Sequence, residues 1–239
     1  MSDDKSYFLN IMMMWIVLVG IPILIGLWAQ MRVSSAFNHW KEVGATSGLT
    51  GAEVARRILS ASGIRDVEVL PIEDMLGDHY DPSRKVLCLS PDVYNGTSVA
   101  AIGIAAHECG HAIQHQKAYA PLHIRMAVVP VTQFASGLLP VIFLGTLFFG
   151  LFKLALLAVA VYLVLTLFSL ITLPVEFDAS RRAKAIVQQL GMIQPGEEAK
   201  GINKVLDAAA LTYVAAFVAS LGTLLYYLSI VMGQRGEER

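Results

Sequence analysis

A long apolar stretch limits what this chain can fold into. The segment from Met126 to Leu173 contains a single charged residue, Lys153. A helix needs about 20 apolar residues to cross the hydrocarbon core of a bilayer, so this segment has room for two crossings. We expect them over residues 126–149 and 154–173, with a tight turn near Gly150 and Lys153, and with Pro174 ending the second helix.

Two further segments have the same apolar character. Residues 8–29 carry no charge and predict a first membrane helix, which Pro22 should kink. A cleaved signal peptide is the alternative, but the apolar run is long for one, and Asp3 and Asp4 precede it where basic residues are expected. A last helix should open at Pro195–Glu198 and continue into a span over residues 208–232.

The composition agrees with a membrane protein. Hydrophobic residues make up 55% of the 239 positions and charged residues 15%. The hydrophobic share is higher and the charged share lower than in an ordinary soluble domain. The formal net charge of -1 gives no reason to expect a nucleic-acid partner. We therefore predict a mainly α-helical, polytopic membrane protein with four transmembrane helices, which forms a single domain over residues 1–239 in contact with the lipid bilayer.

The segment 30–120 is polar enough to form a small soluble α+β lobe. Thr50 and Glu53 have the spacing of a capping box, which predicts a helix that ends near Gly63. Residues 67–70 and 86–89 are rich in strand formers, and residues 77–82 between them have the composition of a loop. An edge of this sheet can pair with an extended peptide; a purely structural hairpin is the alternative.

The motif His107-Glu108-Cys109-Gly110-His111 lies on a predicted helix over residues 98–116, with Thr97 or Ser98 as its N-cap. Residues four apart on a helix lie about 40° apart around its axis, so both histidines can reach one metal ion. Glu108 is close enough to hold and deprotonate a water on that ion. Cys109 faces away and should pack as a small apolar residue, because two cysteines are too few for a disulfide framework.

Zinc suits this H-E-x-x-H pattern, because imidazole is a good zinc ligand and zinc-bound water has a pKa near 7. The alternative is a pair of core histidines beside an unrelated glutamate. That arrangement would bury charge without a partner on an apolar helix, which is costly. We predict a zinc site with His107 and His111 as ligands.

A catalytic zinc ion needs a third protein ligand. The extended motif that continues with Gly and a third His is excluded, because those positions hold Gln114 and Lys117. Glu176 is the first acidic residue after Glu108, at the membrane boundary and in the first turn of a helix predicted over residues 175–190. Helix capping alone is the other interpretation of Glu176. The weaker ligand candidates are Asp178, His39, His79, His115 and His123.

The count of spans is consistent with this choice of ligand. Four spans place residues 30–125 and 174–207 on the same side of the bilayer, as a shared metal site requires. These two segments also carry most of the Lys and Arg residues, including Arg181, Arg182 and Lys184. The positive-inside rule therefore predicts a zinc site on the cytoplasmic face.

Three stretches together carry a resemblance to a known family. HECGHAIQ at 107–114, DHYDP at 78–82 and LPVEFDAS at 173–180 resemble the YugP-like neutral zinc metallopeptidases of bacterial membranes, over nearly the whole chain. The resemblance implies a zincin-like lobe of the glutamate-zincin type, with His107, His111 and Glu176 as zinc ligands and Glu108 as general base. Related membrane zincins have Glu-x-x-x-Asp at the third ligand; Ser180 occupies the Asp position here and is the candidate partner of a zinc-bound histidine.

The resulting hypothesis is a Zn²⁺-dependent endopeptidase in a bacterial cell membrane, which cleaves membrane or misfolded proteins. A donor to the oxyanion is expected, and Tyr213 and His79 are the candidates, although each also has a structural interpretation. A membrane zinc transporter and a catalytically silent metal-binding adaptor are the alternatives. An intramembrane protease would need Asp207 as a ligand, which the sequence around Asp207 disfavours.

Overall fold

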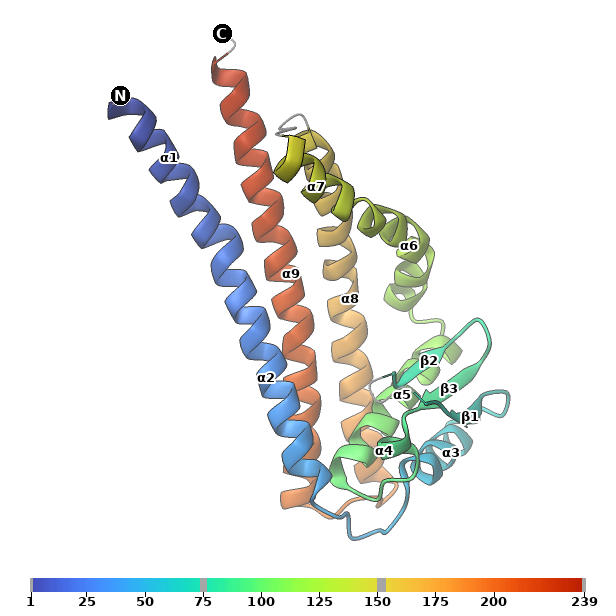
Figure 1. The fold of residues 1–239 in the computed structure, drawn as a ribbon. Coiled ribbons are helices and arrows are strands. Elements are labelled where there is room, and N and C mark those ends of the chain that lie inside the picture. Colours follow the sequence, from blue (N-terminus) through green and yellow to red (C-terminus); the bar gives the residue numbers. More distant parts are fainter. Residues whose placement is uncertain (1, 74–76, 150–153, 238–239) are drawn as a thin grey trace. The chain divides into compact units, whose positions relative to one another are not determined.

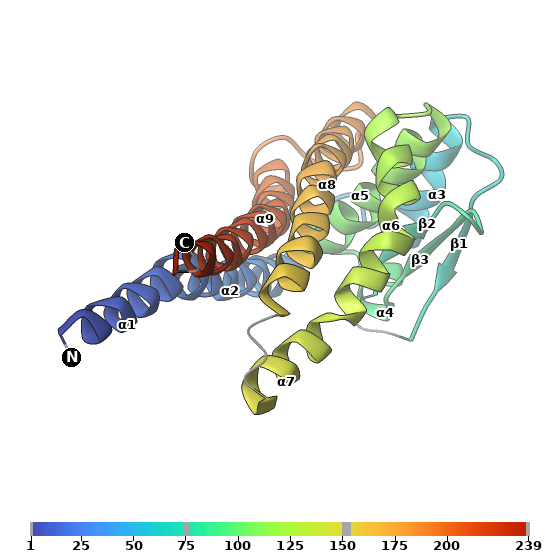
Figure 2. The same cartoon turned by 90° about the horizontal axis from the view of Figure 1, so that it is seen from above.

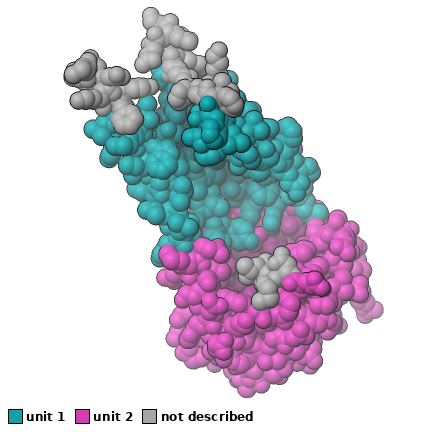
Figure 3. Space-filling view, viewed as in Figure 1, with its two compact units in different colours: residues 1–29, 124–172, 212–239 teal, residues 30–123, 173–211 magenta. Residues whose placement is uncertain are grey.

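The computed structural model describes residues 2–73, 77–149 and 154–237 (Figure 1). The chain divides into two compact units, which Figure 3 colours separately. Unit 1 comprises residues 1–29, 124–172 and 212–239, and unit 2 comprises residues 30–123 and 173–211. The turn predicted near Gly150 and Lys153 lies outside the described residues.

Four helices in the described part of the chain are long and apolar enough to cross a membrane. They cover Leu9–Lys41, Ala120–Phe148, Ala155–Gln189 and Glu197–Gly233. The helical elements within them are α1 (Ser2–Trp15), a π-helical turn η1 (Ile16–Gly20), α2 (Ile21–Lys41), α6 (Ala120–Gly137), α7 (Leu139–Phe149), α8 (Ala155–Gln189) and α9 (Glu197–Glu237). The sequence prediction of four such helices is confirmed.

A π-helical turn, η1, lies just before Pro22, where the sequence predicts a kink. Pro22 has no N–H to donate to the carbonyl of Leu18, and the N–H of Ile21 binds the carbonyl of Ile16 instead. The Leu18 carbonyl faces Gly222 of α9, where an added Cβ would lie 2.0 Å from the oxygen. Within unit 1, this position therefore requires glycine.

Two of the predicted helix bounds are wrong, each near a proline. Residues 126–149 form two helices rather than one, because the backbone breaks at Leu138, two residues before Pro140. The sequence predicts that Pro174 ends a helix, but α8 runs through it without interruption. The hydroxyl of Tyr119 and the amide of Gln114 bind the carbonyls of Pro174 and Val175. We infer that these tertiary contacts hold the helical path that the proline alone disfavours.

The predicted helix boundaries of unit 2 are confirmed at two N-caps. Thr50 and Glu53 form the complete capping box of α3 (Gly51–Ala61). Ser98 caps α5 (Val99–Gln116), the helix that carries the motif, by accepting a hydrogen bond from the N–H of Ala101. A single-turn helix, α4 (Pro91–Tyr94), precedes α5.

The sheet of unit 2 has three strands rather than two (Figure 2). Strands β1 (Glu68–Pro71) and β3 (Val86–Leu89) pair in parallel, and β2 (His79–Asp81) pairs antiparallel with β3 at the edge. The prediction of a loop for the segment of β2 is wrong. The half-buried carboxylate of Asp78 accepts hydrogen bonds from the N–H and hydroxyl of Ser90 at 2.7 and 3.0 Å, which fixes the start of β2 against the end of β3.

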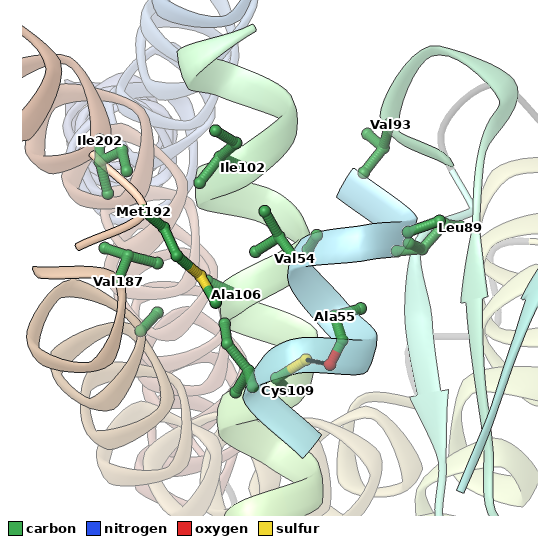
Figure 4. Close-up of a cluster of buried hydrophobic side chains, with 14 of the residues drawn as sticks. Val54, Ala55, Leu89, Val93, Ile102, Ala106, Cys109, Val187, Met192 and Ile202 are labelled. Carbon is green, nitrogen blue, oxygen red and sulfur yellow. Dashed lines mark hydrogen bonds between the residues drawn. The ribbon is translucent and has the colours of Figure 1, made fainter. Parts of the chain in front are cut away.

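The core of unit 2 lies around α5. Figure 4 shows α5 with α3 on one side and residues of α8, α9 and their connection on the other. Cys109 is fully buried and its thiol contacts the Ala55 carbonyl at 3.6 Å, so its predicted packing role is confirmed. The fully or almost fully buried residues around α5 include Val54, Ala55, Ile102, Ala106, Val187, Met192 and Ile202.

Gly110 sets the approach of α5 to α8. An added Cβ at Gly110 would lie 2.6 Å from the carbonyl oxygen of Ala179 and 3.0 Å from its Cα. Both are backbone atoms of a buried helix and cannot move aside cheaply. The two helices can therefore pack at this separation only because position 110 has no side chain.

We expect Gly110→Ala to destabilise the protein, although alanine favours a helix over glycine by about 1 kcal/mol. Overpacking against rigid neighbours costs about 1–3 kcal/mol, so the clash should exceed the propensity gain. Thermal unfolding of the purified protein in detergent measures the effect. Gly103→Ala on the same helix is the control, because its Cβ would come no closer than 3.5 Å to its nearest neighbour, Ile202, which is an ordinary van der Waals contact. Equal melting temperatures for the two variants would contradict the prediction.

Candidate metal centre

The helix α5 presents His107, Glu108 and His111 as the motif predicts. The imidazoles of His107 and His111 lie one turn apart, with ring centroids separated by 4.8 Å and planes at 85°. Their side chains are 13% and 11% exposed, and Glu108 is buried. The two rings are thus held edge to face in a largely enclosed position.

Glu176 of α8 meets both histidines. Its Oε2 atom lies 3.2 Å from Nε2 of His107 and 3.6 Å from Nε2 of His111, and its side chain is 3% exposed. The ligand atoms of the three residues all lie within 4.8 Å of one another. Among the described residues, this is the one group of three or more His, Cys, Asp or Glu side chains that can hold a metal ion.

The other ring nitrogen of His107 contacts Ser180. The Ser180 hydroxyl lies one turn beyond Glu176 on α8 and is 3.1 Å from Nδ1 of His107. An Nδ1–H donated to this hydroxyl leaves the Nε2 lone pair directed at Glu176 and the centre. This is the position in which a residue orients a metal-bound histidine.

The corresponding partner of His111 was not predicted from the sequence. Nδ1 of His111 lies 3.0 Å from Oε1 of Gln114, a fully buried side chain. Gln114 follows His111 by three positions and so shares its helix face. That spacing, together with a long polar residue on an otherwise apolar helix, is the signal that could have identified it.

The acidic groups and imidazoles of the centre influence one another strongly. Burial raises the pKa of Glu108, and the nearby His107 and His111 only partly oppose this rise. Burial lowers the pKa of His111, but its contact with Glu176 and the charges of Glu108 and Glu176 outweigh burial, so the pKa is raised. The site thus attracts positive charge, which a metal cation can supply.

Glu108 differs from the other buried acids of unit 2. Glu176 and Asp178 both bind side chains, whereas Glu108 has no hydrogen-bond partner among the residues that the structure describes. An ionisable carboxylate that is buried beside two imidazoles without such a partner is costly. A water molecule on a metal ion would satisfy it.

The remaining candidate residues lie outside this group. His79 is exposed on the edge strand β2, with Nδ1 2.5 Å from the Gly77 carbonyl. Tyr213 belongs to unit 1. Asp178 binds Gln114, Arg181 and Arg182 rather than a histidine. The roles of His79 and Tyr213 as oxyanion donors stay predictions.

The weaker histidine candidates have other contacts. Nδ1 of His115 lies 2.8 Å from the hydroxyl of Tyr80, and its ring lies 5.8 Å from that of His123. His39 packs edge to face on Trp40. None of the three belongs to the group that can hold a metal ion in the described part of the chain.

Comparisons with known proteins identify the family of this chain. A family model described as "putative neutral zinc metallopeptidase" matches residues 14–232. The chain is also 48% identical over 225 residues to the "putative membrane protease YugP" of Bacillus subtilis (strain 168), which covers 94% of this chain and all of that protein. No solved structure matches the chain. Because the family match spans the motif helix and all three candidate ligands, the chain belongs to the family described as "putative neutral zinc metallopeptidase".

Proposed function

We propose that this protein is a zinc-dependent membrane endopeptidase of the glutamate-zincin type, which cleaves peptide bonds of membrane or misfolded proteins. The observation that carries the proposal is the convergence of His107, His111 and Glu176, with ligand atoms within 4.8 Å of one another, beside the buried Glu108. Two imidazoles and one carboxylate are the protein ligands of several catalytic zinc sites, which keep a fourth position open.

The residues of the centre divide into ligands, partners and a base. Zinc, when bound, would polarise the scissile carbonyl and lower the pKa of water to about 7. Glu108 orients the attacking water, takes its proton and then gives a proton to the leaving amine. Ser180 can accept a hydrogen bond from Nδ1–H of His107, which leaves Nε2 free. Because the ligands are largely buried, they are already held in one geometry before the reaction. No conformational entropy has to be lost to order them during the reaction.

The edge strand β2 is the place where we expect an extended substrate to bind. One side of β2 is paired with β3, and its other side is the sheet edge. An extended peptide can add to such an edge through main-chain hydrogen bonds. The exposed His79 on this strand would then be close to a substrate carbonyl, which is why it remains a candidate oxyanion donor.

The alternatives have less support. A transporter or a silent adaptor would need neither a base nor a substrate edge beside the metal ligands. The family match and the similarity to a protein named as a membrane protease favour peptide hydrolysis. Peptide cleavage by the purified protein, inhibited by a chelator and restored by zinc, tests the proposal directly.

We expect Glu108→Gln to retain zinc and to lower the cleavage rate by about 10²- to 10⁴-fold, the usual contribution of a general base. The amide keeps the size of the side chain but cannot accept the proton of water. Zinc content by elemental analysis and kcat for a denatured protein substrate measure the two effects. Glu68→Gln, an exposed glutamate on β1, is the control. A variant at Glu108 with near-normal kcat would exclude it as the base.

We expect Glu176→Ala to lower the zinc content of the purified protein and to abolish cleavage, because it removes one of three ligands. The matched control is Asp207→Ala, an acidic residue of α9 whose side chain is 68% exposed. Its zinc content should equal that of the unchanged protein. Full zinc occupancy in Glu176→Ala would assign the third ligand to another residue.

We propose that the metal centre faces the cytoplasm, because the segments that form it carry most of the basic residues. A cysteine introduced at exposed Lys117 should react with a membrane-impermeant maleimide only after the cells are opened. The two native cysteines are buried and should stay silent. Lys153→Cys, which the charge distribution assigns to the opposite side, should react in intact cells. The reverse pattern would place the site outside.

A further inference from the structure

Gln114 lies where the motif helix meets α8. Its side chain is fully buried, and it follows His111 by three residues on the same helix face. The side-chain amide contacts three groups: Nδ1 of His111, the carbonyl of Val175 and the carboxylate of Asp178. Gln114 therefore contacts His111, a predicted zinc ligand. It also contacts α8 before and after the predicted ligand Glu176, which lies between Val175 and Asp178 in the sequence.

The surroundings fix which end of the amide points at His111. Nε2 of Gln114 lies 2.8 Å from the Val175 carbonyl oxygen and 3.0 Å from Oδ2 of Asp178. A carbonyl only accepts hydrogen bonds, and so does an ionised carboxylate. Asp178 is held ionised by Arg181 and Arg182, which both bind it. The NH₂ group thus donates both of its hydrogens to α8, and Oε1 is left to face His111.

The orientation of the amide determines the tautomer of His111. Because Oε1 of Gln114 can only accept, the hydrogen of a neutral His111 must be on Nδ1, 3.0 Å away. The lone pair is then on Nε2, the atom that faces Oε2 of Glu176 at 3.6 Å. The opposite tautomer would leave Nδ1 and Oε1 in contact as two acceptors.

We propose that Gln114 is a positioning residue of the metal centre, which fixes His111 with Nε2 free for zinc and holds the turn of α8 that carries Glu176. The inference rests on the zinc site of the proposed function but not on its catalytic activity. If Gln114 only tied α5 to α8, the two hydrogen bonds that it donates to α8 would be sufficient. The third hydrogen bond, which Oε1 accepts from Nδ1 of His111, predicts an effect on metal binding as well.

The first test replaces Gln114 by Met, which has a similar length and no hydrogen-bonding amide. Full-length protein in detergent is stripped of metal, and its zinc affinity is measured by competition with a chromophoric chelator. We expect binding about 10- to 100-fold weaker, the usual loss when the partner of a metal-bound histidine is removed. The d–d absorption spectrum of Co²⁺-loaded protein should also change, because His111 is no longer held in one orientation.

Gln116→Met is the matched control. It is the same substitution two residues further along α5, at an exposed position and on a different face from His111. Its zinc affinity and Co²⁺ spectrum should equal those of the unchanged protein. If Gln114→Met behaves like Gln116→Met in both measurements, the inference is wrong.

An exchange of the acid and the amide between positions 114 and 178 separates an effect on the metal centre from a loss of protein stability. Gln114→Glu alone places two carboxylates in direct contact and should bind zinc poorly. The double variant Gln114→Glu with Asp178→Asn restores a donor opposite an acceptor at position 178, and the introduced carboxylate can still accept from Nδ1 of His111. The contact of that carboxylate with the Val175 carbonyl is repulsive in both variants and therefore cancels in the comparison between them. We expect the double variant to bind zinc at least about tenfold more tightly than Gln114→Glu, a coupling that the double-mutant cycle measures directly.

The outcomes distinguish this inference from the proposed function. An unchanged protein that binds zinc but cleaves no peptide would refute the protease function and leave the role of Gln114 testable by affinity. If Gln114→Met does not fold, the inference is tested by the zinc affinities of Gln114→Glu and of the double variant. A double variant no better than Gln114→Glu would overturn the inference, and restored affinity would support it. Failure of the unchanged protein to bind zinc would overturn both.

Discussion

The close backbone contact between α5 and α8 determines the geometry of the candidate centre. Gly110 lies against Ala179 at a distance that leaves no room for a Cβ atom. His107 and His111 flank Gly110 on α5, and Glu176 and Ser180 flank Ala179 on α8. Because residues three apart share a helix face, this contact brings the face of α5 that carries His107 against the face of α8 that carries Glu176, and both histidines lie within 3.6 Å of the Glu176 carboxylate. A side chain at position 110 would push the two helices apart and so separate the ligands on α5 from the ligand on α8.

The polar groups of this centre are expensive to bury, and their arrangement offsets much of the cost. Each imidazole uses one nitrogen toward Glu176 and the other toward a neutral side chain, Ser180 or Gln114. Gln114 has all of its hydrogen-bonding groups in use, as a fully buried amide should. Glu108 is the exception, since it has no hydrogen bond to another described residue. A buried acid without a protein partner, in a cluster whose other polar side chains are paired, is where function is expected to oppose stability.

Local rules govern the parts of this structure that could be predicted from the sequence. The spacing of His107 and His111 and the caps at Thr50 and Ser98 depend on helix geometry alone, and the structure agrees with both predictions. Glu176 could be proposed because the apolar spans leave few acids for the site. The helix through Pro174, the strand β2 and the role of Gln114 could not be predicted, because each depends on contacts with segments distant in sequence. At those positions tertiary contacts outweigh the local signals.

The departure at Ser180 from the Glu-x-x-x-Asp pattern of related membrane zincins has a structural counterpart. The aspartate expected at that position would support a zinc-bound histidine with a negative charge. Here His107 contacts a hydroxyl, while Asp178, two residues earlier on α8, turns to the other side and binds Gln114. We infer that the carboxylate still acts on the centre, through an amide and on His111 instead of His107. In this arrangement the negative charge of Asp178 reaches His111 only through Gln114 and does not contact an imidazole directly. Among the three candidate ligands, only Glu176 then carries a negative charge.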